Sequence, residues 1–321
     1  MSKQTRRREV ITLLAGAAAW PLLAPAQQPR LATIGVLVLG NPPPAPFLKA
    51  LREGLRHVGY TEGRNFRLEL RTAEERVGLL PEKAAELVRL KVDIIVAFQT
   101  PASTAAKQAT SEIPIVMAGV GDPVGTGLVA SLARPGGNVT GTSSGGAEIA
   151  GKSVQLIREV LPPARRIAVL ANETDPFSRP FLAEIGRVSR SAGMEMEPVL
   201  ARPAEPLEAA FRTMTGKGVA AVIIQGSLLR QEAVDLAMKH RLPSFSVNRQ
   251  GPPLGGLMSY SANFGELYRE TAVYIDKILK ARSQPTYRSP SPPSSSWCST
   301  SKPPRRSASS SRSRSCSAPT R

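Results

Sequence analysis

The sequence is poor in cysteine, histidine and aromatic residues. Its two cysteines, Cys298 and Cys316, both lie near the C-terminus, so the rest of the chain offers no disulfide, thiolate nucleophile or cysteine metal site. The two histidines, His57 and His240, lie far apart, and no H-E-x-x-H motif or pair of acids at metal-binding spacing occurs. We therefore expect neither a metal site nor a cofactor.

Long apolar runs are also scarce, and the main one lies at the N-terminus. The run Val10–Leu23 follows a cluster of arginines and precedes the small residues APA, which is the pattern of a cleaved export signal. A membrane anchor is disfavoured, because the run contains Pro21 and is shorter than the roughly 20 residues that span a bilayer. We predict a signal peptide over residues 1–26 that resembles the twin-arginine type, cleavage after Ala26, and a periplasmic location.

The positive charge is unevenly distributed. Of the formal net charge of +17, residues 1–27 carry +3 and residues 282–321 carry +8, which leaves +6 on the remaining chain. That remainder has no basic run interleaved with aromatic residues, as nucleic-acid modules have. We therefore expect no nucleic-acid partner.

Residues 282–321 differ in composition from the rest of the chain. Serine, proline and arginine dominate, and apolar side chains nearly vanish, which is typical of a disordered tail. A second hypothesis is a shifted reading frame, since one choice of codons for residues 293–308 encodes KFELVLNLKTAKALG in another frame. That peptide has the pattern of a strand followed by a helix, so under this hypothesis the last strand that crosses between lobes is missing.

Alternating apolar strands and amphipathic helices predict an α/β fold of two doubly wound lobes. In the first half, strands are expected at 33–39, 66–71 (nearer a sheet edge), 93–98 and 113–118, and helices at 47–58, 80–90 and 100–109, with Thr100 as the N-cap of the last. In the second half, strands are expected at 166–170, 195–200, 219–224 and 244–247, and helices at 148–160, 177–192, 205–214, around 237 and at 264–280.

The stretch from Ile113 to Gly141 joins the two halves. We expect its strand to run into a glycine-rich turn, a helical turn at 128–132 and a Pro-Gly-Gly break. A second crossing segment is expected at 255–260. The predicted lobes are therefore residues 30–141 plus 257–281, and residues 142–256, joined by crossing hinge strands and closing on a ligand by hinge motion.

Several ordered runs resemble a known family. They are GLRHVGY at 54–60, EGRN at 62–65, IPIV at 113–116, DPV at 122–124, GLV at 127–129, LARPGGNVTG at 132–141 and GLMSY at 256–260. On these runs, residues 31–280 resemble the substrate-binding proteins of bacterial ABC importers, specifically the tryptophan/tyrosine-type family with a type I periplasmic-binding-protein fold. The resemblance implies a monomer that traps a small molecule, such as an amino acid, between two lobes and presents it to an ABC permease in the inner membrane, without a catalytic step.

Two other functions were weighed against binding. Residues 141–145 read GTSSG and match the G-x-S-x-G elbow of serine hydrolases, so an exported hydrolase using Ser143 or Ser144 is the alternative. It ranks lower because neither histidine has a clear role as the base. Dinucleotide binding is weaker still, since Gly119-Val120-Gly121 lacks the third glycine of the fingerprint.

Open α/β sheets bind ligands at the carboxyl ends of their strands, and polar residues at those ends form the predicted binding site. Asp122 is expected to pair with an ammonium group, and the helix N-termini after Thr100 and near Ser143 to hold a carboxylate. Taken singly, Thr100 and Asn172 fit a capping or turn role equally well. The predicted set is Gly40, Asn41, Gln99, Thr100, Ser103, Asp122, Ser143, Ser144, Asn172, Ser227 and Asn248.

Overall fold

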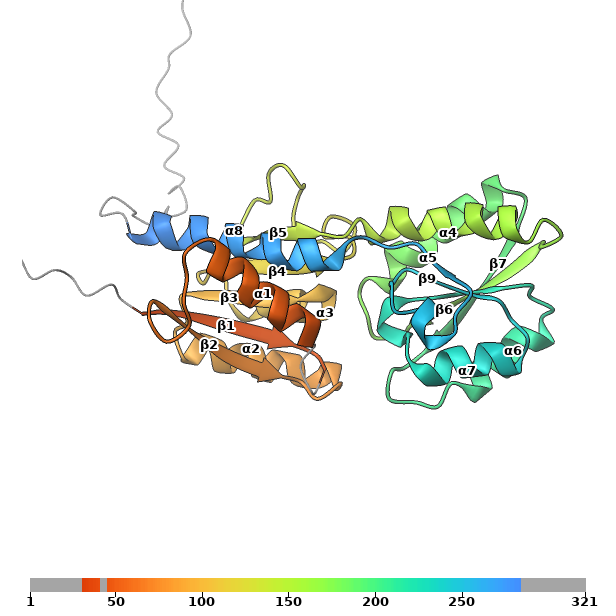
Figure 1. Ribbon diagram of the computed structural model, residues 1–321, viewed down its shortest axis with the longest axis horizontal. Coiled ribbons are helices and arrows are strands. Elements are labelled where there is room, and N and C mark those ends of the chain that lie inside the picture. Colours follow the sequence, from red (N-terminus) through yellow and green to blue (C-terminus); the bar gives the residue numbers. More distant parts are fainter. Residues whose placement is uncertain (1–30, 41–44, 284–321) are drawn as a thin grey trace, which may run out of the picture. The chain divides into compact units, whose positions relative to one another are not determined.

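The computed structural model describes residues 31–40 and 45–283 and contains two five-stranded parallel sheets (Figure 1). The strand orders are β2-β1-β3-β4-β5 and β10-β9-β8-β6-β7. In both sheets the chain starts near the middle, adds strands to one side and then crosses to the other, which is the doubly wound arrangement that the sequence pattern predicts. The predicted signal peptide, Asn41 and residues 284–321 lie outside the described residues.

The first lobe is built around strands that are buried on both faces. Its elements are β1 (Ala32–Val38), α1 (Ala45–His57), β2 (Phe66–Thr72), α2 (Leu80–Arg89), β3 (Ile94–Phe98), α3 (Gln99–Ala109), β4 (Ile115–Val120), β5 (Val139–Ser143) and α8 (Phe264–Ser283). Every residue of β3 and β4 is buried, as expected for apolar runs in a parallel sheet. Helices α1 and α8 cover one face of this sheet, and α2 and α3 cover the other.

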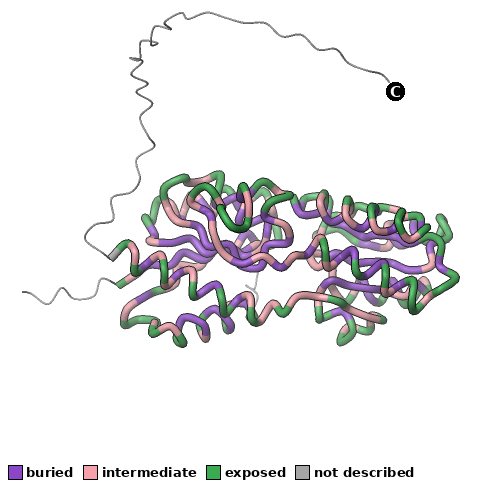
Figure 2. The backbone as a smooth tube through the Cα atoms, turned by 90° about the horizontal axis from the view of Figure 1, so that it is seen from above, coloured by how far each residue is buried: buried purple, intermediate pink, exposed green. Residues whose placement is uncertain are grey.

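The second lobe repeats this plan. Its elements are α4 (Gly146–Val160), β6 (Arg166–Asn172), α5 (Ser178–Ser191), β7 (Glu195–Ala201), α6 (Glu208–Gly216), β8 (Val222–Ile224), α7 (Gln231–Lys239), β9 (Ser244–Ser246) and β10 (Met258–Ser259). Helices α4 and α5 cover one face and α6 and α7 the other. Figure 2 shows the buried residues concentrated in the strands and on the inner sides of the helices.

The stretch that joins the lobes differs from its prediction in two places. The Pro-Gly-Gly break lies at 135–137 as expected, but the residues after it form a strand that was not predicted, β5, which pairs with β4 in parallel register. The expected helical turn at 128–132 is absent, and the turn lies earlier, at 123–127, where the amide of Thr126 donates to the carbonyl of Asp122. Strand β5 is missing from the prediction because its residues, VTGTS, lack a continuous apolar pattern.

The chain crosses between the lobes after β5 and again between β10 and α8. β5 belongs to the first sheet and β10 to the second, so the sheets divide at slightly different residues from the predicted borders after 141 and before 257. Helix α8 runs to Ser283, past the predicted start of the tail at 282. None of the described helices is long and apolar enough to cross a membrane.

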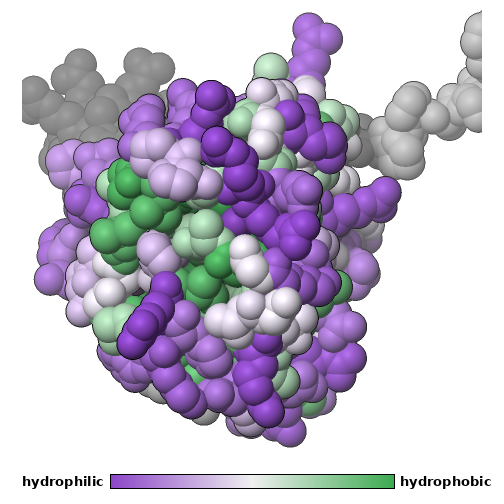
Figure 3. All heavy atoms as spheres, turned by 90° about the vertical axis from the view of Figure 1, so that its right-hand side faces the viewer, coloured by the Kyte–Doolittle hydropathy of each residue, from purple (hydrophilic) through white to green (hydrophobic). Residues whose placement is uncertain are grey.

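The surface of the second lobe is largely polar. Figure 3 shows mostly hydrophilic side chains at this end, with a limited apolar area among them. The large apolar side chains of this lobe that are exposed are Val160, Leu200, Met238 and Leu257.

Candidate functional site

A pocket lies between the carboxyl ends of strands from both sheets, the position at which open α/β sheets bind their ligands. Its lining comes from the ends of β3, β4 and β5 in the first lobe, from the loops after β6, β8 and β9 in the second, and from the start of α8. The lining residues are Gln99, Thr100, Gly119, Gly121, Ser144, Gly146, Ile149, Asp175, Phe177, Gln225, Gly226, Ser227, Val247, Asn248, Ala262 and Phe264.

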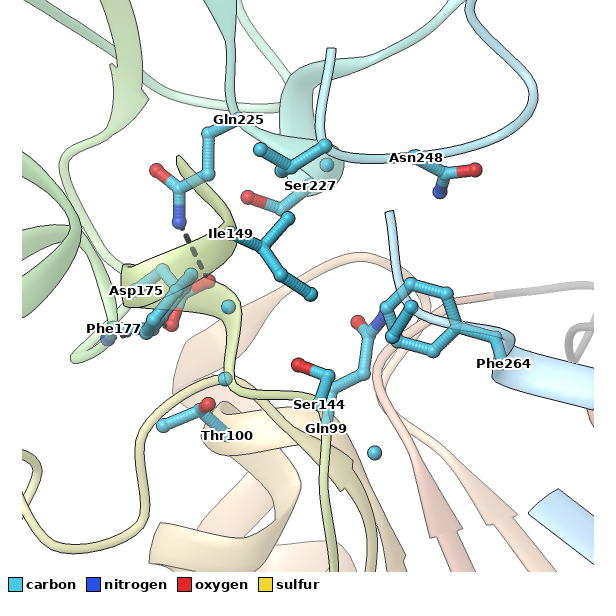
Figure 4. A pocket seen from close by; sticks show the side chains of 16 residues that line it. Gln99, Thr100, Ser144, Ile149, Asp175, Phe177, Gln225, Ser227, Asn248 and Phe264 are labelled. Carbon is cyan, nitrogen blue, oxygen red and sulfur yellow. Dashed lines mark hydrogen bonds between the residues drawn. The ribbon is translucent and has the colours of Figure 1, made fainter. Parts of the chain in front are cut away.

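Five of the predicted site residues line this pocket. They are Gln99, Thr100, Ser144, Ser227 and Asn248, and Figure 4 shows their side chains around it. The expected N-cap role of Thr100 is wrong: α3 starts one residue earlier, at Gln99, and Phe98 occupies the N-cap. Whether these five side chains contact a ligand stays a prediction.

Five other predicted residues do not line the pocket. Gly40 lies in a bend after β1, and Ser103 donates from its hydroxyl to the carbonyl of Gln99 at 2.7 Å. The Asp122 carboxylate accepts the amide of Gly125 at 2.7 Å and so closes the turn that follows β4. The Ser143 hydroxyl accepts the amide of Gly145 at 3.3 Å.

The fifth, Asn172, lies directly behind the lining. It is fully buried, and its backbone N–H donates to the side-chain oxygen of Gln225 at 2.8 Å. The Ser178 hydroxyl donates to the same oxygen at 2.7 Å. Because two donors hold this oxygen, the NH₂ group of Gln225 must point the other way, toward Asp175.

Asp175 is the charged group of the pocket. It is 9% exposed, one carboxylate oxygen accepts the amide N–H of Phe177 at 2.9 Å, and the other accepts the NH₂ group of Gln225 at 3.1 Å (Figure 4). Burial raises the pKa of the Asp175 carboxyl to about 6, although the bond from the Phe177 amide acts in the opposite direction. The carboxylate is therefore held by neutral donors, and none of the described residues that line the pocket beside it is cationic.

Aromatic and aliphatic side chains supply the rest of the lining. Phe177 and Phe264 stand on opposite sides in the view of Figure 4, with Ile149 between them. The rings are supported from behind: Phe264 packs on Tyr268 with centroids 5.7 Å apart, and Phe177 on Phe181 with centroids 5.6 Å apart. The pocket thus combines one buried acid, several neutral polar groups and an apolar body.

Glycines bring the two lobes close together at this point. A Cβ atom added to Gly121 would lie 2.5 Å from the ring of Phe177, and one added to Gly146 would lie 2.8 Å from it. The amide of Gly146 also donates to the carbonyl of Gly121 at 2.8 Å. The ring of Phe177 therefore packs directly against the backbone at Gly121 and Gly146. A larger residue at either position would collide with this ring.

The backbone of Gln99 has an unusual conformation. Its φ is +62°, which non-glycine residues seldom adopt, and such residues cluster at functional sites. The strained residue directs its side chain into the pocket (Figure 4).

Comparison with known proteins identifies the family. A sequence model described as ABC transporter substrate binding protein matches residues 37–286. The chain belongs to that family. A tyrosine-binding protein of Clostridioides difficile strain R20291 is 38% identical over 133 residues, which cover 41% of this chain and 37% of that relative. The match therefore spans little more than a third of the length of that relative.

Solved structures agree with the family. A conserved domain protein of Vibrio cholerae has a TM-score of 0.72 and 26% identity, with 78% of this chain and 86% of that chain covered. A Streptococcus pneumoniae protein solved in complex with L-Trp has a TM-score of 0.71 and 25% identity, with 78% and 85% covered. The substrate-binding protein described here has the type I periplasmic-binding-protein fold, as its sequence runs predict.

The hydrolase alternative gains no support from the pocket of this substrate-binding protein. The sequence 141–145 does span a strand-to-helix turn, since residues 141–143 end β5 and residues 144 and 145 lead into α4. However, His57 is exposed near the end of α1, and His240 stacks on Phe211 with centroids 6.1 Å apart, so neither lines the pocket. The described residues also contain no group of three or more His, Cys, Asp or Glu side chains able to hold a metal ion.

Sequence reasoning missed several lining residues. Asp175 and Phe177 lie in the loop after β6, a few residues beyond Asn172, where the predicted strand end was placed. Gln225 directly follows β8 and satisfies the same strand-end rule as Ser227, so it could have been included. Phe264 was assigned only to an amphipathic helix, and no sequence signal marks it as a pocket residue.

Proposed function

We propose that this substrate-binding protein takes up an amino acid with an apolar or aromatic side chain in the pocket between its lobes. The observation that carries the proposal is the buried carboxylate of Asp175 beside the apolar surface of Phe177 and Phe264; within the part of the chain that the structure describes, the lining gives this carboxylate no cationic neighbour. A buried charge without a counter-charge is costly, and an ammonium group supplies that charge. The tyrosine-binding relative and the tryptophan-bound neighbour support the same ligand class.

The neutral polar groups complete this assignment. Gln99, Thr100, Ser144, Ser227 and Asn248 offer hydroxyl and amide groups to the polar end of the ligand. Phe177, Phe264 and Ile149 surround its side chain. Five other predicted residues lie outside the lining, in the bend, turns and hydrogen bonds described above. They are Gly40, Ser103, Asp122, Ser143 and Asn172.

The family and the signal-like N-terminus favour an exported protein that works with a membrane permease. We place it in the periplasm after cleavage behind Ala26, as a monomer that delivers its ligand to an ABC permease and performs no chemical step. N-terminal sequencing of the exported protein should give Gln27 as its first residue. A mature protein with a different first residue would contradict cleavage after Ala26.

A thermal-shift screen of the mature protein against the common amino acids tests the binding proposal. Ligand at about 100 times Kd stabilises the native state by about 2.7 kcal/mol, so at least one apolar or aromatic amino acid should raise Tm by several degrees. If none does, and esterase activity is found that Ser143→Ala or Ser144→Ala removes, the hydrolase alternative replaces this proposal.

A further inference from the structure

We propose that the pocket recognises its ligand's charge through the ammonium group alone, so that primary amines without a carboxylate also bind and carboxylic acids without an ammonium do not. This inference rests on the proposed function and goes beyond it, because it extends the ligand class from amino acids to the corresponding amines. It follows from the charges that the lining presents.

Over residues 31–40 and 45–283, the lining contains one ionisable side chain, the carboxylate of Asp175, and no lysine, arginine or histidine. Its remaining polar side chains are neutral: Gln99, Thr100, Ser144, Gln225, Ser227 and Asn248. A ligand carboxylate in this pocket can therefore be held only by neutral donors, in a space that already contains a negative charge.

The position of that negative charge is fixed. One oxygen of Asp175 accepts the backbone N–H of Phe177 and the other accepts the NH₂ group of Gln225, and the Ser227 side chain also hydrogen-bonds to this carboxylate. The side-chain amide of Gln225 is in turn oriented by the backbone N–H of Asn172 and the hydroxyl of Ser178, which both donate to its oxygen. The carboxylate can therefore neither swing out of the pocket nor find a cation in its lining, and a ligand ammonium is the counter-charge it lacks.

The three kinds of ligand then rank by charge. An amine forms a neutral pair with Asp175. An amino acid forms the same pair and adds a carboxylate that neutral donors must hold, so its affinity should lie within about tenfold of that of the amine. An acid without the ammonium places two negative charges in one partly dry pocket, and repulsion between such charges some 5 Å apart corresponds to about a hundredfold loss of affinity.

Calorimetric titration of the mature protein with matched ligand triplets tests this ranking. Suitable triplets are leucine, isoamylamine and 4-methylpentanoate; phenylalanine, phenethylamine and hydrocinnamate; and tryptophan, tryptamine and indole-3-propionate. In the triplet whose amino acid binds, we expect the amine to bind within about tenfold of it and the acid to bind at least a hundredfold more weakly.

The outcomes separate the inference from the proposed function. An amino acid that binds while its amine does not, or an acid that binds as tightly as the amine, overturns the inference and leaves the proposed function standing. Tight binding of the acids alone would mean an aromatic or aliphatic carboxylate pocket and overturn both. Failure of all three members of every triplet also overturns both.

A pair of variants checks that Asp175 sets the ranking. Asp175→Asn removes the charge and should weaken amine binding at least thirtyfold, while the gap between amine and acid closes. Glu148→Gln removes an exposed carboxylate near the start of α4, outside the lining, and should leave the ranking unchanged. If Asp175→Asn folds poorly, the ligand triplets on the unaltered protein still decide the question.

Discussion

At the scale of single residues, the ionisation of Asp175 should control ligand affinity. With its pKa raised to about 6 by burial, the carboxyl is charged above pH 6 and increasingly neutral below it. A ligand ammonium binds the charged form, so affinity should be constant above about pH 7 and fall about tenfold between the plateau and pH 5, because protonation of the free site competes with binding.

Isothermal titration of the bound amino acid between pH 5 and pH 8 measures this dependence. The other lining residues that the structure describes have no ionisable side chains, and the ligand's ammonium does not titrate in this range. An affinity that does not change between pH 7 and pH 5 would contradict the assignment of Asp175 as the ammonium partner.

At the residue level, the sequence predicted pocket-lining positions where a topological rule applied; contact of these residues with a ligand stays a prediction. Gln99, Ser227 and Asn248 were placed at the pocket because ligands bind at the carboxyl ends of parallel strands. The sequence predicted Asp122 as the partner of the ammonium and missed Asp175, although both are acids in loops that follow predicted strands. Only the three-dimensional structure distinguishes an acid that closes a turn from one whose carboxylate lies inside the pocket.

At the scale of secondary-structure elements, strands and helices with continuous apolar or amphipathic patterns were predicted within a few residues. Strand β5 was not, because its five residues, VTGTS, contain one fully apolar side chain and a glycine. Its conformation depends on pairing with β4, a contact between segments that local sequence does not reveal. The sequence therefore predicted the sheets but not the strand from which the chain leaves the first one.

The packing of β5 on β4 depends on the absence of a side chain at Gly141. Its φ is +132°, and a Cβ atom there would overlap the backbone carbonyl of Met117. Gly141→Ala should therefore lower the free energy of unfolding by about 3 kcal/mol, combining backbone strain with overpacking. Urea denaturation followed by circular dichroism measures the change.

Gly137→Ala is the matched control in the same segment. This residue has no positive φ, and a Cβ atom there would meet no atom within 4 Å. The control should change stability by less than about 0.5 kcal/mol in either direction. Equal effects of the two substitutions would show that the β4–β5 contact does not need the glycine.

At the scale of the whole described chain, the two lobes have separate cores. Two apolar clusters lie on the faces of the first sheet and two on the faces of the second, and none of these clusters contains residues of both lobes. Phe177 of the second lobe packs against Gly121 of the first. Each lobe should therefore unfold largely on its own when no ligand is bound.

Core substitutions with hydrogen exchange test this independence. Phe211 is fully buried in the second lobe and Phe47 in the first, and replacing either by alanine should cost about 3–5 kcal/mol. In the ligand-free protein, Phe211→Ala should reduce protection of amides in the second lobe only, and Phe47→Ala in the first lobe only.

A ligand held by both lobes couples them, so at saturation each substitution should also lower protection in the opposite lobe. If ligand-free protection falls equally in both lobes with either variant, the lobes form one cooperative unit, and their closing on a ligand would need motion within a single core.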